Sequence, residues 1–291
     1  MNHIIKDFAL AGLLLAPAPA WSSPEVLSVP ATNLPAAPQV DGQVGEWNAA
    51  SWKSVAVTPA IEDDAENRTG KLTIEFQAAI HDDTLYLAAR WPDAEADTRY
   101  RPWRWSGTKY RRIKKRDDMF AVRFDMDGDF HECMIAERDY RVDVWLWSAG
   151  RSNAIGMAED MSHRITTEYT ENAAEYEGPT GITVYIIKTA DAGDPPYRYT
   201  RPNRRKFKGK NLPGVEPAQS ATGSAGDVRA KGLWKDGVWT LEFSRSLNTS
   251  HDDDVQFSSG EIYRAQIAVF NRGFSQHKSV SKVLEIHLPQ P

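Results

Sequence analysis

The side chains able to bind a metal are few, and their spacing excludes the common metal sites. The chain holds one cysteine, Cys133, and seven histidines. A single cysteine excludes an internal disulfide framework, a paired-cysteine metal site and a covalently attached c-type haem. His277 and His287 stand alone and His251 lies in an acidic turn, so the histidines lack a metal-ligand spacing. We expect the histidines to be surface or structural residues.

Sequence motifs of known enzymes are absent from the chain. It contains no GxSxG, no HExxH, no P-loop and no Rossmann fingerprint. Residues 125–129 (Asp-Met-Asp-Gly-Asp) resemble a calcium loop, but the glycine is displaced and no glutamate stands at the twelfth position. A turn at the end of a strand explains this segment better. A hydrolase with unrecognised carboxylates is therefore the weakest interpretation of function.

Lys278 is the most unusual candidate, because its position in a strand predicts that it points inward. It shares even parity with the apolar residues of the last strand, which are Val280, Leu284, Ile286 and Leu288. An inward lysine either extends to solvent, pairs with a carboxylate, or loses its proton and binds a metal. Lys282 has the same parity and competes with Lys278 for each of these roles.

The elements that would position these residues are strands. From about residue 70 to the end, apolar and polar residues alternate with a period of two. Hairpins are predicted over 72–91 and 234–247, the second closed by Lys235-Asp236-Gly237. Further strands are predicted over 120–126, 142–147, 182–187, 263–270 and 280–288. Several short antiparallel strands separated by turns predict an all-β fold, a two-sheet antiparallel β-sandwich of the immunoglobulin-like or carbohydrate-binding-module-like kind.

The remaining segments set the domain boundaries. Residues 1–20, with Lys6, an apolar run and Ala18-Pro19-Ala20, predict a signal peptide cleaved near Ala20 and hence a periplasmic protein. A Pro- and Ala-rich linker is predicted over 21–37 and one sandwich domain over 38–291. No later apolar run is long enough to span a membrane.

Two basic segments interrupt the strand pattern. Residues 100–116 combine many arginines and lysines with Trp103, Trp105 and Tyr110, and the insertion over about 190–229 is rich in Pro, Gly, Lys and Arg. Both are predicted to be long loops, either solvated insertions or docking surfaces for an acidic partner. The net charge of the whole chain is −5, which argues against general nucleic-acid binding.

Four regions together resemble one family, the haem b (gamma) subunit of type II DMSO-reductase-like molybdoenzymes, of which the ethylbenzene dehydrogenase gamma subunit is the reference. Residues 40–47 (VDGQVGEW) look like the opening strand of the family, and residues 78–93 look like its hairpin ending in W-x-D. Residues 133–160, with the tryptophan-rich strand, and Lys278-Ser279-Val280-Ser281 complete the resemblance. Leu146 and Ser148 depart from the W-H-W-K that the family commonly shows.

This resemblance implies one non-covalent b-type haem held between a methionine and a lysine. The lysine corresponds to Lys278 and the methionine to Met134, with Met126, Met157 and Met161 as rivals. Trp145 and Trp147 would be core residues, porphyrin contacts or both. Cationic partners for the haem propionates would come from Arg101, Arg104 and Arg151.

The resemblance implies a function in electron transfer rather than an enzyme with its own active site. With both axial positions filled by protein, a haem only exchanges electrons. The implied partners are the catalytic and iron–sulfur subunits of a molybdoenzyme or a periplasmic cytochrome. The alternative is a haem-free carbohydrate- or ligand-binding sandwich, in which the aromatic residues of 103–110 would stack on sugars.

Overall fold

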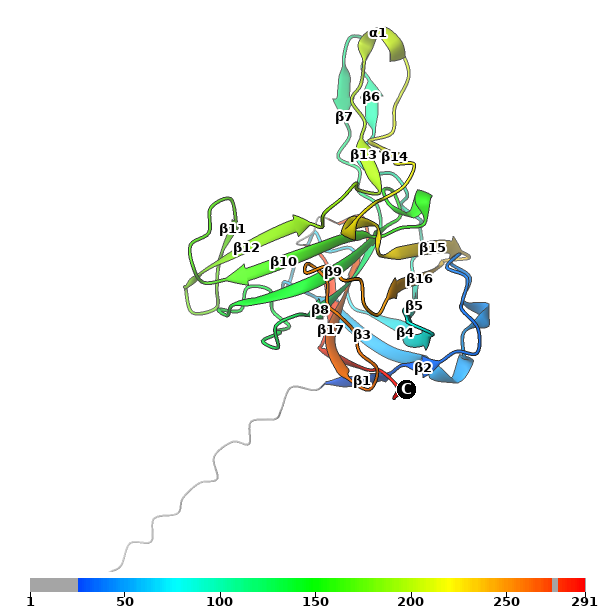
Figure 1. Cartoon of the computed structure of the whole chain (residues 1–291). Helices are drawn as coiled ribbons and strands as arrows, with labels where there is room; N and C mark the ends of the chain where they lie inside the picture. Colours follow the sequence, from blue (N-terminus) through cyan, green and yellow to red (C-terminus); the bar gives the residue numbers. More distant parts are fainter. Residues whose placement is uncertain (1–25, 274–276, 291) are drawn as a thin grey trace, which may run out of the picture.

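The computed structural model describes residues 26–273 and 277–290 and contains strands and short helical turns (Figure 1). The predicted signal peptide lies outside the described residues. The strands of the main sheet are β1 (Leu27–Pro30), β2 (Thr32–Asn33), β3 (Lys53–Pro59), β4 (Leu72–His81), β5 (Thr84–Pro92), β8 (Met119–Asp125), β9 (Tyr140–Ser148), β10 (Glu159–Thr166), β11 (Ala174–Glu177), β12 (Thr183–Ala190), β15 (Arg229–Lys235), β16 (Val238–Ser246), β17 (Ile262–Phe270), β18 (Ser279–Ser281) and β19 (Leu284–His287).

The main sheet folds over to form two layers, as a β-sandwich requires. Its central path runs β11-β12-β10-β9-β8-β17-β18-β3-β4-β5-β16-β15. Side chains from β8, β9 and β17 pack against side chains from β3, β4, β5 and β16 in one large core cluster. The all-β sandwich prediction is confirmed, and the short strand β18 joins the two layers because it pairs with β17 on one side and β3 on the other.

The predicted hairpins are present with the expected turns. β4 and β5 pair around Asp82, and β15 and β16 pair around Asp236 and Gly237. Asp236 and Gly237 both have positive φ, 51° and 84°, as a type I′ hairpin turn demands. Because this turn matches the twist of the flanking strands, the local sequence alone fixes the register of the pair.

The predicted linker is partly wrong. Within 21–37, β1 pairs in parallel with β19, and β2 pairs in parallel with β4. Val29 is fully buried in the core between the layers. The Pro and Ala content suggested a linker, but short parallel edge strands tolerate proline where no ladder donor is required.

The last predicted strand is broken, which changes the direction of Lys278. Residues 282 and 283 separate β18 from β19, so Leu284 and Ile286 pack between the layers. Val280 lies opposite Ala268 in the antiparallel ladder and therefore on the same face of the sheet, away from that core. The predicted common parity of Lys278 with Leu284 is therefore wrong, because the interruption shifts the alternation.

The two basic segments pair with each other and form a projecting arm, defined here as residues 98–116 and 197–217 (Figure 1). The first contributes the hairpin β6 (Trp103–Trp105) and β7 (Tyr110–Arg112), the second β13 (Tyr197–Tyr199), α1 (Arg204–Phe207) and β14 (Val215–Pro217). Trp103 and Leu212 exchange backbone hydrogen bonds of 2.8 and 2.9 Å. The predicted loops thus contain short strands that support each other.

The remaining elements are single 3-10 turns. They are η1 (Val44–Glu46), η2 (Ala49–Ser51), η3 (Asn153–Ile155) and η4 (Ser224–Gly226). Next to η1, Trp47 donates from its indole Nε1 to Glu242 of β16 over 2.7 Å. The backbone N–H groups of Asp41 and Gly42 donate to the same carboxylate. This contact fastens the segment over 40–47 to the second layer.

Candidate functional site

A second apolar cluster covers the face of β8, β9, β10, β12 and β17 that is turned away from the sandwich core, here called the outer face. It comprises buried side chains such as Val142, Val144 and Ile165, and Met134 and Met161 pack against it. A β-sheet usually exposes one face to water or covers it with another layer. Here residues 126–139, which connect β8 to β9, cover part of the outer face.

Arg123 on β8 holds this covering loop in place. It is only 6% exposed, and its guanidinium donates to the carbonyl oxygens of His131 and Glu132 over 2.7 and 2.8 Å. It also lies 4.7 Å from the ring centre of Phe130. Tyr140 donates its hydroxyl to the carbonyl of Cys133 over 3.3 Å. These contacts fix the backbone on both sides of Met134.

Gln266 on β17 connects the segment of Met134 with the segment of Lys278. Its side-chain amide donates to the carbonyl of Glu132 over 3.2 Å and to the carbonyl of Ser281 over 2.7 Å. Lys278 lies three residues before Ser281, and its own carbonyl accepts from Asn67 over 2.8 Å. Two residues far apart in the sequence, Met134 and Lys278, are therefore carried by segments that meet at one edge of the outer face.

Lys278 and its rival Lys282 differ in their surroundings. Burial, together with the positive charges of Lys188 and Arg123, lowers the pKa of Lys278 to about 8. Lys282 is exposed and forms a surface ion pair of 3.1 Å with Glu132. Deprotonation to the amine that can bind a metal therefore costs less at Lys278 than at an ordinary lysine, whereas Lys282 has the contacts of an ordinary surface cation.

His163 on β10 is a further buried polar group on the outer face. It lies directly opposite Val142 on β9 and Lys188 on β12, so all three side chains share this face. It is 7% exposed, and neither ring nitrogen has a hydrogen-bond partner among the described residues. Burial lowers the pKa of His163 to about 3, with the charges of Lys188, Arg123 and Lys278 acting in the same direction.

His163 was not among the predicted site residues, because the histidines were expected to be surface or structural residues. The alternation of Met161, His163 and Ile165 with more polar neighbours was the available signal. It places His163 on an apolar face of the strand, but the sequence does not show that this face is covered. Unpaired imidazole nitrogens in a buried site are costly unless a ligand, proton or metal satisfies them.

The residues on the outer face fit a haem. A thioether, an amine with a lowered pKa and a buried neutral imidazole are all ligands of haem iron. The apolar cluster suits a porphyrin ring, and Lys188 at the rim offers a cation to a propionate. The orphaned ring nitrogens of His163 are the observation that most requires a bound group here.

Trp145 and Trp147 lie on the opposite side of the same strand. Both are fully buried in the core between the layers, where Trp145 packs on Phe124 and Trp147 on Trp239. Alternation along β9 directs Val142 and Val144 to the outer face instead. Of the two roles predicted for the tryptophans, the core role agrees with the structure, and contact with a haem on the outer face does not.

The predicted propionate partners also lie elsewhere. Arg151 is 9% exposed and pairs with Glu159 over 3.0 Å and with Asp117 over 3.6 Å. It also lies over the ring of Tyr100 at 4.8 Å, where the arm meets the body. Arg104 is exposed on β6, and Arg101 is in the arm with a positive φ of 43°. Arg151 therefore has a structural role, because two carboxylates already neutralise its charge.

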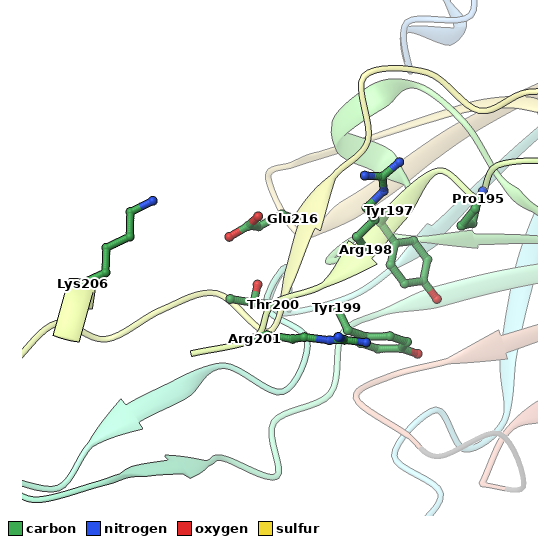
Figure 2. Close-up of a pocket in the computed structure, with 8 residues that line it drawn as sticks. All are labelled: Pro195, Tyr197, Arg198, Tyr199, Thr200, Arg201, Lys206 and Glu216. Atoms are coloured by element: carbon green, nitrogen blue, oxygen red, sulfur yellow. The ribbon is translucent and has the colours of Figure 1, made fainter. Parts of the chain in front are cut away.

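The arm contains a recess of about 730 Å³ (Figure 2). Its lining joins aromatic rings with cations and one carboxylate, and the residues are Pro195, Tyr197, Arg198, Tyr199, Thr200, Arg201, Lys206 and Glu216. Of the aromatic residues predicted to stack on sugars, Trp103 is partly buried and donates its indole N–H to the carbonyl of Thr200 over 3.2 Å. Arg112 stacks on the same indole at 5.0 Å.

Comparison with known proteins identifies a family. The sequence model described as ethylbenzene dehydrogenase matches residues 18–281. No curated protein matches the chain. Among the described residues, no helix has the length and apolar character needed to cross a membrane.

Solved structures with a similar course of the chain are carbohydrate-binding proteins. A carbohydrate binding module of family 9 from Caldicellulosiruptor kristjanssonii, in complex with glucose, is 14% identical, with 91% of this chain and 96% of that chain covered and a TM-score of 0.38. A putative carbohydrate-binding protein from Bacteroides uniformis is 9% identical, with 90% and 100% covered and a TM-score of 0.45. Similarity this low carries no inference about a ligand.

Proposed function

This chain belongs to the ethylbenzene dehydrogenase family, and we propose that it binds one non-covalent b-type haem and transfers electrons as a subunit of a molybdoenzyme-type redox complex. The observation that carries the proposal is the outer face, where Met134, Lys278 and His163 are brought to one partly covered apolar surface. The chain would act as an electron carrier and the chemical reaction would take place in another subunit.

Met134 and Lys278 would hold the iron. Met134 comes from the loop fastened by Arg123, and Lys278 from the segment linked to that loop through Gln266. When bound in this way, a haem supplies a one-electron carrier with no open coordination position. The protein contributes an amine whose neutral form is favoured by burial, and a soft thioether that stabilises reduced iron. Met161 on β10 also packs on the outer face and is therefore the rival of Met134 as a ligand.

The partner of this electron carrier would meet it in the periplasm. The proposed partners are the catalytic and iron–sulfur subunits of a molybdoenzyme, or a periplasmic cytochrome, and export depends on the predicted signal peptide. The arm would dock on an acidic surface of that partner. Residues 98–116 and 197–217 hold 16 of the 35 Lys and Arg residues of the chain but one of its 40 Asp and Glu residues.

A haem titration of the purified full-length protein tests the proposal. We expect one equivalent of haem to give a six-coordinate, low-spin absorption spectrum in both redox states. In parallel, calorimetry with glucose and cellotriose tests the haem-free sugar-binding alternative. Saturable sugar binding by a protein that fails to take up haem would overturn the proposal in favour of that alternative.

A further inference from the structure

Five carboxylates converge at one end of the sandwich core, away from the outer face. This acid cluster consists of Asp143 on β9, Asp160 on β10, Asp191 after β12, and Asp253 and Asp254 in the loop after β16. Carboxylate oxygens of Asp143, Asp160 and Asp254 lie within 4.8 Å of one another, as do those of Asp191, Asp253 and Asp254. Asp254 belongs to both groups and joins them.

Four of the five carboxylates are buried, and two groups among the described residues pair with the cluster, the buried Arg245 and the partly exposed His251, whose Nδ1 lies 3.9 Å from Oδ2 of Asp254. Asp143, Asp160, Asp191 and Asp254 are between 0% and 6% exposed. Arg245 reaches across from β16 and pairs with Asp143 over 2.5 Å and with Asp254 over 3.1 Å. One guanidinium and one partly exposed imidazole cannot neutralise five carboxylates, and buried carboxylates without compensation are expensive.

Some carboxylate oxygens of the acid cluster already accept hydrogen bonds, which leaves the other oxygens available to a ligand. Arg245 and the backbone N–H of Val255 occupy Oδ2 of Asp143, and Arg245 occupies Oδ1 of Asp254. Asp253 accepts from the Ser224 hydroxyl over 2.8 Å and from the Ala192 N–H over 3.3 Å. These contacts hold the loop and the strands in place without using the other oxygens of the cluster.

Six buried carboxylate oxygens have no hydrogen-bond partner among the described residues. They are Oδ1 of Asp143, both oxygens of Asp160, both oxygens of Asp191 and Oδ2 of Asp254. Asp160 is 3% exposed, so a buried carboxylate with two unpaired oxygens points into the group. Nearly all buried polar atoms in proteins are satisfied, so six unpaired acceptors require either a bound cation or protons shared between the carboxylates.

We propose that Asp143, Asp160, Asp191 and Asp254 bind one Ca²⁺ ion. The donor set is made of hard carboxylate oxygens, and calcium takes six to eight such ligands in a flexible geometry. Mg²⁺ retains several of its waters and is held by one or two carboxylates, which suits a wetter site. The ion would connect β9, β10, the end of β12 and the loop at 248–257, and so stabilise one end of the sandwich.

The site is independent of haem binding, because it lies on the core side of β9 and the haem site lies on the outer face. Trp145 is directly opposite Asp160 in the ladder, and its ring lies 4.8 Å from the guanidinium carbon of Arg245. A tryptophan beside the site allows Tb³⁺, a luminescent substitute for Ca²⁺, to be detected through energy transfer. Failure of the haem proposal would leave this measurement unaffected.

The test uses full-length protein freed of metal with a chelator. We expect 1 mM Ca²⁺, a concentration of roughly 100 times Kd, to raise the Tm by about 5 °C, and Mg²⁺ at the same concentration to have little effect. Excitation of tryptophan should produce Tb³⁺ emission, which excess Ca²⁺ should abolish. Asp160→Asn and Asp191→Asn should each lose the Tb³⁺ emission and the Ca²⁺-dependent rise in Tm.

Asp127→Asn is the matched control, because Asp127 is a surface acid paired with Arg141 at 3.0 Å and should leave both signals unchanged. If wild-type protein shows the same Tm with Ca²⁺ and with chelator and gives no Tb³⁺ emission, the cluster is held by shared protons and the proposal is overturned. An equal response to Mg²⁺ would overturn the assignment to Ca²⁺. The wild-type result decides the question even if an asparagine variant fails to fold.

Discussion

At the scale of residues, burial decides which of several similar side chains can bind a metal. Lys278 and Lys282 are four positions apart, yet the pKa of Lys278 is lowered to about 8 by burial while Lys282 pairs with Glu132 at the surface. Met134 and Met161 both pack on the outer face, although one belongs to the covering loop and the other to β10. The structural environment of each residue therefore decides which lysine or methionine can bind a metal, and the sequence alone does not show this difference.

The methionines give the first prediction. Met134→Ala should lower the reduction potential of the bound haem or weaken haem binding, because a thioether stabilises reduced iron. Met161→Ala should change the apolar packing but leave the potential close to that of the wild type. Redox titration followed by visible absorption checks this prediction. A potential that falls in Met161→Ala and not in Met134→Ala would assign the ligand to β10.

Resemblance to the family predicted Lys278 and Met134 as ligands, whereas the sequence did not predict that His163 is buried at the same site. Hydrophobic alternation identifies which residues share a face, but it does not reveal which faces are covered. The loop over 126–139 covers the outer face through contacts between Arg123 and the carbonyls of His131 and Glu132. Such contacts join residues through backbone atoms, and these leave no pattern in the side-chain sequence.

At the scale of elements, the loop over 126–139 depends on one buried arginine. Arg123→Gln should destabilise the protein by about 2–4 kcal/mol, because two carbonyls lose a charged donor, and should weaken haem binding by displacing Met134. Arg141→Gln is a suitable control, since Arg141 holds Asp127 of the same loop through a surface ion pair, which contributes less than about 1 kcal/mol. Urea unfolding and haem titration measure the two effects. Equal losses in both variants would contradict this role of Arg123.

The segment over 40–47 is fastened by Glu242, and this contact should depend on pH. Burial raises the pKa of Glu242 to about 7 despite the hydrogen bonds from Trp47 and Gly42. Since the folded pKa exceeds the unfolded value of 4.5, the stabilisation is complete below pH 4.5 and is lost as pH rises through 7.

Glu242→Gln should therefore reduce the difference in unfolding free energy between pH 5 and pH 8.5, on the order of 1–2 kcal/mol. The prediction concerns only this difference between the two pH values, and not how much Glu242→Gln changes the unfolding free energy at either pH. Glu75→Gln on β4 serves as the control, because Glu75 is partly exposed and bonds Ser54 at the surface. A pH dependence that stays at the wild-type value in Glu242→Gln would show that other groups cause it.

The sequence predicted the strands more accurately than the interruptions between them. The hairpin at 234–247 follows from Asp236-Gly237 and the alternation around it, and the structure contains it. The interruption at Lys282 and Val283 has no comparable local signal, because the ladder of β18 with both β17 and β3 determines it. The strands β1 and β2 in the predicted linker likewise depend on partners more than 40 residues away.

At the scale of the whole molecule, charge is separated between the arm and the body. Outside the arm the chain has 19 Lys and Arg residues against 39 Asp and Glu residues, whereas the arm has 16 against one. The strand β6, Trp103–Trp105, alone extends about 10 Å at roughly 3.3 Å per residue, which exceeds the Debye length of about 8 Å at physiological salt. The negative charge of the body therefore does not cancel the positive charge at the tip of the arm.

Ion-exchange chromatography tests this separation. Although the net charge is −5, the protein should be retained on both anion and cation exchangers at pH 7 and low salt. Replacing the exposed Arg104, Arg198, Arg205 and Lys208 by glutamine should abolish retention on the cation exchanger. Replacing four exposed cations of the body, Lys71, Arg90, Lys235 and Lys282, should leave that retention intact. Loss of retention in both variants would mean that the arm has no special role.

The central claim, that the outer face holds a haem through Lys278, is tested most directly by comparing the visible and electron paramagnetic resonance spectra of Lys278→Ala and Lys282→Ala after loading with haem. We expect Lys278→Ala to convert a six-coordinate, low-spin haem into a five-coordinate or water-ligated high-spin haem, and Lys282→Ala to keep the wild-type spectrum. A wild-type spectrum in Lys278→Ala, together with a high-spin spectrum in His163→Ala, would assign the iron to His163 and contradict the account.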